Sequence, residues 1–172
     1  MVFGLTLSAY TLLHVAISLV GIVSGLIVLR GLLAGKRLEG WTGLFVATTV
    51  ATSVTGFGFP FEHLLPSHIV GMISLVVLSI AILARYAFHL SGAWRKVFVI
   101  GAVLALYLNV FVLIVQGFLK VPALNALAPT QSEPPFLIAQ LAVLALFLGF
   151  AICAVKKFKM PVRSGKSRSA TA

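Results

Sequence analysis

The chain has 172 residues, 60% of them hydrophobic, and a mean hydropathy of +1.14. A water-soluble protein of this size could not bury so much apolar surface, so the composition indicates a membrane protein. The net charge of +10 does not indicate nucleic-acid binding, because the basic residues lie between and after apolar runs and the sequence contains no nucleic-acid-binding motif.

Taken in chain order, five apolar segments are long enough to cross a bilayer, which requires about 20 residues. They cover residues 11–33, 41–59, 67–90, 97–119 and 135–155. Short polar turns separate the first four segments, and the longer last connection contains four prolines, which oppose a regular helix there. No Lys or Arg precedes the first segment, so we expect it to be retained rather than removed as a signal peptide. The sequence therefore predicts an all-α, polytopic bundle of five transmembrane helices, which forms a single domain over residues 1–159.

The distribution of positive charge predicts how this bundle is oriented. Of the 13 Lys and Arg residues, 12 fall on one side of the predicted spans, and Lys120 alone falls on the other. Positive residues are enriched in the cytoplasmic segments of membrane proteins, so we expect the N-terminus outside and the C-terminus inside. Residues 160–172 are polar and basic, and we expect a disordered cytoplasmic tail that anchors this orientation, with docking to anionic lipid or an acidic partner as the alternative.

In this orientation each predicted helix carries a hydrogen-bonding or ligating side chain near its outer end. These residues are His14, Thr55, His68, Gln116 and Gln140. Histidines on facing helices can ligate the iron of a b-type haem, and His, Gln and Thr side chains can hydrogen-bond the carbonyl oxygens of a quinone. Their shared depth makes the five residues candidates for a haem b or quinone site in the outer leaflet.

A second group of residues could instead hold a metal ion. His14, His63, His68 and Glu62 offer the nitrogen and oxygen ligands that zinc or copper accepts. The competing interpretation of both groups is structural. In that case His14 is a buried histidine bonded to a neighbouring Thr or Gln, and His63 and His68 are ordinary interfacial residues.

Two further polar residues lie within the predicted spans. Asn109 is near the middle of the fourth span, where a side-chain amide either lines a pathway or forms a hydrogen bond between helices. Arg85 is near the inner end of the third span, where we expect it to extend toward the inner headgroups. We expect Tyr86 and His89 to lie in the same interface.

Enzymatic activity is not expected from this sequence. It contains no motif of a metalloprotease, a serine hydrolase or a phosphate-binding loop, and its three acidic residues lie outside the predicted spans. Three classes stay open: a small-ligand-binding or redox-accessory protein, a structural or assembly subunit of a membrane complex, and a small transporter or channel. The expected partners are the lipid bilayer and other membrane-protein subunits.

Four strings of the sequence resemble a known family. They are SVTGFGFPF at residues 53–61, LPSHIVG at 65–71, YLNVF at 107–111 and APTQSEPPF at 128–136. They are similar to segments of a family of small proteobacterial inner-membrane proteins that has no established activity, substrate or cofactor. The resemblance covers the chain except for its tail. It implies a bacterial inner membrane, in which the outer side of the protein faces the periplasm.

Overall fold

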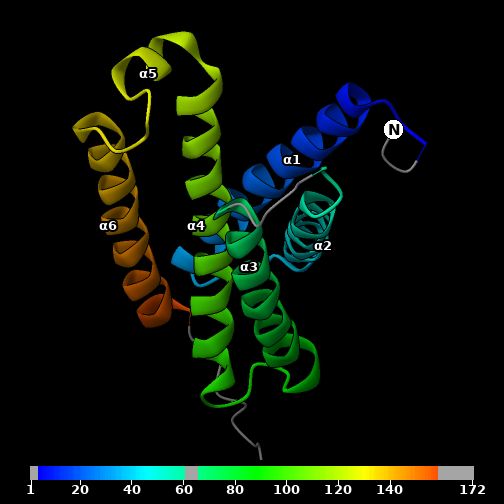
Figure 1. Ribbon diagram of the computed structural model, residues 1–172. Helices are drawn as coiled ribbons and strands as arrows, with labels where there is room; N and C mark the ends of the chain where they lie inside the picture. The colour runs from blue at the N-terminus through cyan, green and yellow to red at the C-terminus, as the bar shows by residue number, and fades with distance from the viewer. Residues whose placement is uncertain (1–3, 61–65, 159–172) are drawn as a thin grey trace, which may run out of the picture.

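The computed structural model describes residues 4–60 and 66–158, and the regular structure of these residues is helical, without a β-strand (Figure 1). The all-α prediction is therefore confirmed for this part of the chain. The helices are α1 (Leu7–Leu33), α2 (Glu39–Gly56), α3 (Pro66–Ile82), α4 (Trp94–Lys120), α5 (Pro122–Leu127) and α6 (Pro134–Lys157). A π-helical turn, η1 (Leu83–Ala87), follows α3 directly. The expected tail, residues 160–172, lies outside the described residues.

Each of the five predicted segments corresponds to a long helix, and the differences lie at the helix ends. α2 ends at Gly56, before the predicted boundary, because the Gly- and Pro-containing run that follows does not sustain a helix. The third segment changes to π-helical geometry after Ile82, and the backbone at His89 and Leu90 has positive φ angles of 49° and 58°. α5 was not predicted, but Pro122 stands in its first turn, where a missing N–H is tolerated.

Four helices are long and apolar enough to cross a membrane, which indicates a multi-pass membrane protein. They are Leu7–Leu33, Ser67–Ala87, Trp94–Lys120 and Pro134–Lys157. α2 is not one of the four. Its 18 residues rise about 27 Å, slightly less than the hydrocarbon thickness of about 30 Å, and its Thr, Ser and Gly residues reduce its apolar content.

α4 lies at the centre of the bundle, where it contacts α1, α3 and α6. In Figure 1, α3, α4 and α6 run alongside one another, whereas α1 and α2 pack against each other and lie obliquely to that group. α2 contacts α1 and also α3. Different faces of α2 therefore meet different neighbours, and this separates the candidate residues described below.

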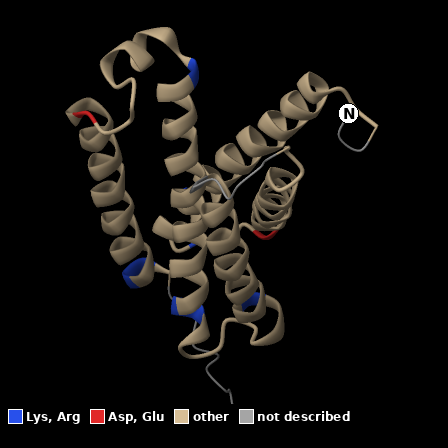
Figure 2. Ribbon diagram, viewed as in Figure 1, with Lys and Arg blue, Asp and Glu red and all other residues tan. Residues whose placement is uncertain are grey.

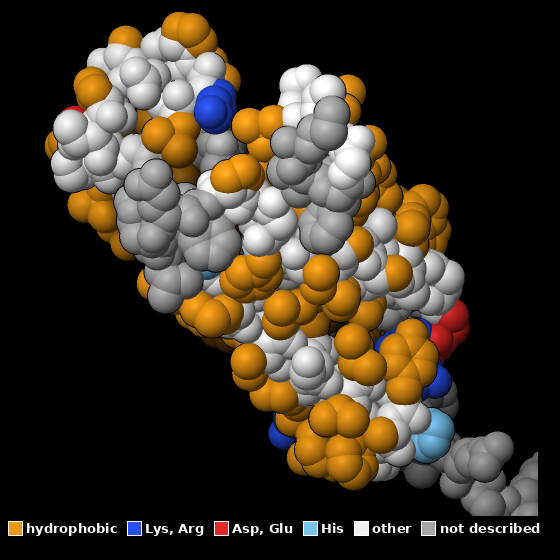
Figure 3. Space-filling model, turned by 45° about the vertical axis from the view of Figure 1, so that its right-hand side comes forward, with side chains coloured by type: hydrophobic (Ala, Val, Ile, Leu, Met, Phe, Trp, Pro, Cys, Tyr) orange, Lys and Arg blue, Asp and Glu red, His pale blue; other side chains and the backbone are white. Residues whose placement is uncertain are grey.

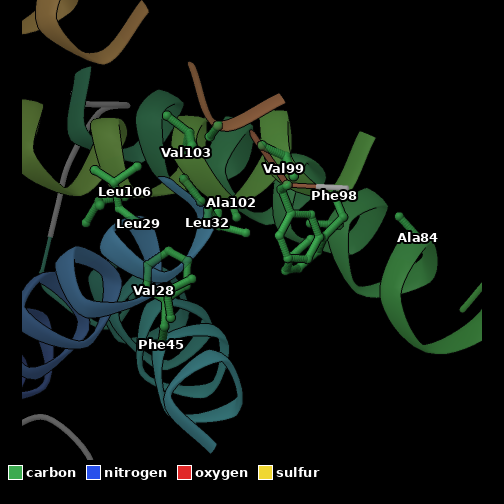
Figure 4. Close-up of a cluster of buried hydrophobic side chains, with 14 of the residues drawn as sticks. Val28, Leu29, Leu32, Phe45, Ala84, Phe98, Val99, Ala102, Val103 and Leu106 are labelled. Carbon is green, nitrogen blue, oxygen red and sulfur yellow. The ribbon is translucent and has the colours of Figure 1, made fainter. Parts of the chain in front are cut away.

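A cluster of buried apolar side chains joins the helices in the interior (Figure 4). Val28 of α1, Phe45 of α2 and Leu106 of α4 are at most 3% exposed. The three helices approach closely at Gly25, where an added Cβ would lie 2.6 Å from Cδ1 of Leu106 and 2.8 Å from Cε2 of Phe45. This crossing therefore requires a residue without a side chain.

The outer surface is largely apolar, as expected for helices that face lipid. Large hydrophobic side chains cover much of the face drawn in Figure 3. Leu12 on α1, Val76 on α3 and Ile138 on α6 are more than half exposed. A water-soluble protein rarely exposes apolar surface on this scale, so the surface agrees with residence in a membrane.

The turn between α1 and α2 is a Schellman motif centred on Gly35. The amide of Lys36 donates to the carbonyl of Gly31 at 2.8 Å, and the amide of Gly35 donates to the carbonyl of Leu32 at 3.1 Å. Gly35 has a φ of 68°, a conformation that glycine adopts without strain. An added Cβ there would lie 3.2 Å from the carbonyl oxygen of Lys157, so this turn packs against the end of α6.

Candidate functional site

The contact that best resembles the predicted outer site joins α1 to α2 through His14 and Thr55. Nδ1 of His14 lies 2.8 Å from Oγ1 of Thr55. The Thr55 hydroxyl also lies 2.7 Å from the carbonyl oxygen of Ala51, and when it donates there the His14 ring is the donor in the first contact. Tyr10 donates to the carbonyl of Thr55 at 2.7 Å, and Phe59 stands edge-on to the His14 ring at 5.2 Å. His14 is thus a hydrogen-bonded histidine at a helix interface, and when Nδ1 is the donor the neutral ring keeps a lone pair on Nε2.

His68 lies in a different environment, between α2 and α3. Its side chain is buried, and its ring stacks on Phe57 with the ring centroids 5.6 Å apart. The same two helices are joined where Ser53 donates to Ser74 at 3.2 Å. Gly71 brings α3 close to the Phe57 ring, which an added Cβ would meet at 3.4 Å. His68 is therefore part of the packing between α2 and α3.

His14 and His68 contact different residues at the C-terminal end of α2. The partner of His14 is Thr55, in the last turn of the helix, and the ring partner of His68 is Phe57, the residue that follows it. A haem iron or metal ion held by both histidines requires that both rings face one space. The described arrangement directs them to separate helix pairs.

The predicted metal ligands include two residues, Glu62 and His63, that lie outside the described part of the chain. Within residues 4–60 and 66–158, no three His, Cys, Asp or Glu side chains lie close enough together to hold a metal ion. The metal-site hypothesis therefore stays a prediction that depends on the loop between α2 and α3.

The two predicted glutamines lie on α4 and α6, and their environments differ. Gln140 is buried, and its Nε2 donates to the carbonyl of Phe111 on α4 at 3.3 Å. Its Oε1 is also buried, and it has no hydrogen-bond partner among the described residues. Gln116 is exposed on α4. Gln140 therefore joins α6 to α4, whereas Gln116 lies on an exposed face of α4.

A ladder of side-chain amides along α4 was not foreseen from the sequence. Three α4 carbonyls each accept a hydrogen bond from an amide further along the chain: Phe111 from Gln140 at 3.3 Å, Val115 from Gln131 at 2.9 Å, and Phe118 from Asn125 at 3.1 Å. These acceptors are spaced four and three residues apart, so they form one stripe on the helix. The ladder fastens α5, the loop that follows it, and α6 to α4. In the sequence, the feature that could have indicated these bonds is the presence of Asn125, Gln131 and Gln140 in and after the Pro-rich connection.

The loop before α6 is further ordered by Glu133. Its carboxylate accepts hydrogen bonds from the backbone amides of Thr130 and Ser132, both at 3.1 Å, and from the Thr130 hydroxyl at 2.9 Å. Desolvation raises the pKa of Glu133, whereas the hydrogen bonds from the backbone and from Thr130 lower it. The lowering is the larger effect, so the pKa lies below the ordinary value for Glu. The charged form of Glu133 is therefore the form that stabilises this loop.

Asn109 forms a hydrogen bond between helices near the middle of the bundle. Its Nδ2 donates to Oγ1 of Thr49 at 3.2 Å, and both side chains are buried. Gly21 of α1 lies at the same contact, where an added Cβ would be 3.5 Å from the Thr49 hydroxyl and 3.7 Å from the Asn109 amide. Of the two interpretations offered for Asn109, the geometry matches the interhelical hydrogen bond between α2 and α4, with α1 packed over it.

Arg85 is buried in the bundle instead of extending outward at the protein surface, so the expectation that it reaches out to the headgroups is wrong. Its side chain is buried and forms an ion pair with Glu39 at the start of α2. The guanidinium carbon lies 5.3 Å from the centre of the Phe98 ring and 5.5 Å from that of Tyr86, within the range of cation–π attraction. The acidic partner and the two rings thus hold Arg85 inside the bundle. His89, in contrast, is exposed as expected for an interfacial residue.

The chain matches no protein-family model, no curated protein and no solved structure. The contacts within the bundle therefore carry the functional argument. Among the described polar side chains, some join neighbouring helices in pairs and others donate to carbonyls of their own helix.

Proposed function

We propose that this chain is a non-catalytic structural or assembly subunit of a membrane complex in the bacterial inner membrane. One observation carries this proposal: several polar side chains of the bundle form hydrogen bonds between adjacent helices. One such bond joins each of four helix pairs: His14–Thr55 for α1–α2, Ser53–Ser74 for α2–α3, Thr49–Asn109 for α2–α4, and Phe111–Gln140 for α4–α6. Burial of apolar surface does not drive helices together in lipid, so such bonds and close packing hold a bundle in shape. The arrangement therefore supports a rigid scaffold.

In this proposal α2 is the fifth span. It is more polar than the other four helices, but Thr42, Thr48 and Thr55 each donate to a backbone carbonyl one turn earlier, at 2.7–2.8 Å. A threonine hydroxyl bonded within its own helix no longer needs a partner from water. Contacts with both α1 and α3 also shield part of α2 from lipid. These features support its placement in the bilayer.

With five spans, the N-terminus lies outside and the C-terminus inside. Figure 2 supports this orientation, because blue Lys and Arg segments gather toward the lower end of the bundle, whereas Lys120 ends α4 at the opposite end. The resemblance of the sequence to proteobacterial inner-membrane proteins adds that the outside is the periplasm. Glu133 and the amide ladder then lie near the periplasmic face.

Cysteine labelling tests this topology directly. In a Cys153→Ala background, a single cysteine is introduced at Ser132, before α6, or at Ser91, before α4. An impermeant thiol reagent added to spheroplasts is expected to label Ser132→Cys and to spare Ser91→Cys until the membrane is broken. Labelling of Ser91→Cys alone in intact spheroplasts would overturn the orientation, and labelling of both would overturn the number of spans.

The structural role is tested on protein purified in a mild detergent. We expect no Soret band, no stoichiometric metal and no co-purifying quinone, and we expect the chain to migrate in a complex larger than itself on native electrophoresis. His14→Ala should lower the midpoint of thermal unfolding, because α1 and α2 lose their hydrogen bond. A chain that always migrates as a monomer, or a bound cofactor lost in His14→Ala without a change in stability, would refute the proposal.

A redox-accessory role with haem b or a quinone is the second candidate, and one observation favours it. When Nδ1 of His14 donates to Thr55, Nε2 of the neutral ring can accept a hydrogen bond from a ligand or ligate iron. The residues fit a quinone better than a haem with two histidine ligands, since the ring of His68 stacks on Phe57 in the packing between α2 and α3. Lipid extraction and mass spectrometry of the purified protein distinguish this candidate from the structural one.

A further inference from the structure

A small cavity lies where four parts of the chain meet: the α1–α2 turn, η1, the start of α4 and the residue that follows α6. Its volume is about 10 Å³, and the residues that line it include Lys36, Arg37, Thr42, Arg85, Phe98 and Phe158. A space of this size holds about one water-sized atom. The cavity could therefore admit a single oxygen atom of a larger group, while the rest of that group stays at the surface.

The surroundings of this cavity carry an excess of positive charge. Lys36, Arg37 and Arg85 line it, and a fourth cation, Arg95, donates to the carbonyl of Phe158 beside it. Within the described residues, Glu39 is the acid that pairs with this group, and its side chain is 65% exposed. One exposed carboxylate leaves the cluster with a surplus of positive charge, which favours an anionic ligand.

Arg85 also offers a hydrogen-bond donor that the described residues do not use. Its side chain is only 6% exposed, and its Nε is buried without a hydrogen-bond partner among those residues. Buried polar groups in proteins are nearly always hydrogen-bonded. The ion pair with Glu39 and the rings of Phe98 and Tyr86 fix the guanidinium in place, and Arg85 is one of the residues that line the cavity.

We propose that the cavity binds a phosphate oxygen of an anionic phospholipid in the inner leaflet. Arg85 donates to this oxygen through Nε, and Lys36 and Arg37 neutralise the part of the headgroup that stays at the mouth. Arginine is well suited to phosphate because its planar donors match the phosphate oxygens. This proposal does not depend on the assembly role proposed above, but its placement in the inner leaflet rests on the orientation proposed there.

A lipid is favoured over a free anion by the position of the cavity. It lies at the basic end of helices that carry exposed apolar surface, and on α1 it is lined by the buried side chains of Val28 and Leu32. Headgroups are concentrated at this level of a membrane protein, and polybasic segments attract the anionic ones. The acyl chains of a bound lipid can then follow the exposed apolar face of α1, where Leu19 and Val23 line a groove of about 240 Å³ with Trp41 of α2.

The test uses the full chain in nanodiscs made either of phosphatidylcholine alone or of phosphatidylcholine with phosphatidylglycerol. Native mass spectrometry of the released protein counts retained phosphatidylglycerol, and thermal unfolding measures stabilisation. The double variant Lys36→Gln/Arg37→Gln keeps the pair of Arg85 and Glu39 intact, and Lys120→Gln removes one charge at the opposite end as the control. We expect the double variant to lose about thirtyfold in apparent affinity for phosphatidylglycerol, equal to about 2 kcal/mol, and Lys120→Gln to bind like the wild type.

Three outcomes would overturn the proposal. Equal binding by the wild type and the double variant would mean that the basic cluster does not select the lipid. An equal loss of phosphatidylglycerol binding in Lys120→Gln would mean that the total positive charge of the protein, and not the basic cluster, determines the affinity. Inorganic phosphate that stabilises the protein in phosphatidylcholine as strongly as phosphatidylglycerol does would identify a free anion as the ligand. Arg85→Gln, combined with Glu39→Gln to avoid an unpaired charge, is expected to abolish binding, and full retention in this double variant would exclude Arg85 as the donor.

Discussion

The substitution Gly25→Ala tests the helix crossing at the centre of the bundle. A new Cβ would lie 2.6 Å from Cδ1 of Leu106 and 2.8 and 2.9 Å from two ring carbons of Phe45, about 1 Å closer than carbon atoms pack comfortably. Phe45 and Leu106 are each 1% exposed, so neither side chain can move into free space. Overpacking of this kind costs about 1–3 kcal/mol, and alanine returns about 0.5–1 kcal/mol through its helix propensity. We expect a net loss of about 1–2 kcal/mol in the free energy of unfolding.

Gly43→Ala on α2 is the matched control, because nothing lies within 4 Å of the Cβ that it adds. It keeps the gain in helix propensity without the overlap, so it should be neutral or stabilising. Reversible unfolding in mixed micelles of increasing SDS content, followed by circular dichroism, measures both variants. The close packing of α1 against α2 and α4 at Gly25 is refuted if Gly25→Ala is as stable as Gly43→Ala.

Three further predictions follow from the polar contacts. Asn109→Leu should lower the free energy of unfolding by about 0.5–2 kcal/mol in the same SDS titration, because it removes the bond to Thr49. Adding Thr49→Val should then increase the loss only slightly, and additive losses would show that the two side chains do not interact. Gln140→Leu should raise hydrogen exchange in the N-terminal half of α6, since the bond from Gln140 to α4 is lost, and exchange unchanged from the wild type would contradict that role. Above the ordinary pKa of Glu, the backbone amides that donate to Glu133 should be fully protected from hydrogen exchange, after correction for intrinsic rates. They should lose this protection as the pH falls through the lowered pKa of Glu133. Glu133→Gln should remove the pH dependence, and a variant that keeps it would identify another titrating group.

The positions of the long helices could be predicted because apolar runs of about 20 residues have few alternatives in lipid. Their ends could not, because they depend on local backbone geometry such as the π-helical turn after Ile82 and the early end of α2 at Gly56. α5 escaped prediction because proline was taken only as a helix breaker, although Pro122 stands where a helix accepts it.

For the candidate site, the sequence could indicate how far along its helix each polar residue lies, but not the direction in which its side chain points. His14 and His68 each lie near a helix end, yet a helix points its side chains around a full circle, and the two histidines contact different residues at the C-terminal end of α2. Which face is covered depends on the packing of helices far apart in sequence. The ion pair of Arg85 with Glu39 could not be predicted for the same reason. The two residues come from η1 and α2, and the local sequence of neither segment indicates that they are in contact.

The threonines of α2 bear on how the chain enters its membrane. A helix with this many hydroxyls and an acidic first turn is a weak insertion signal on its own, whereas α1 is long and strongly apolar. The tight turn at Gly35 and the contacts of Gly21 and Gly25 with α2 join the two helices into a hairpin. We expect α2 to cross the bilayer together with α1 as one unit during synthesis. Fused behind an unrelated signal-anchor, α2 alone should remain outside the membrane, whereas the α1–α2 hairpin should insert.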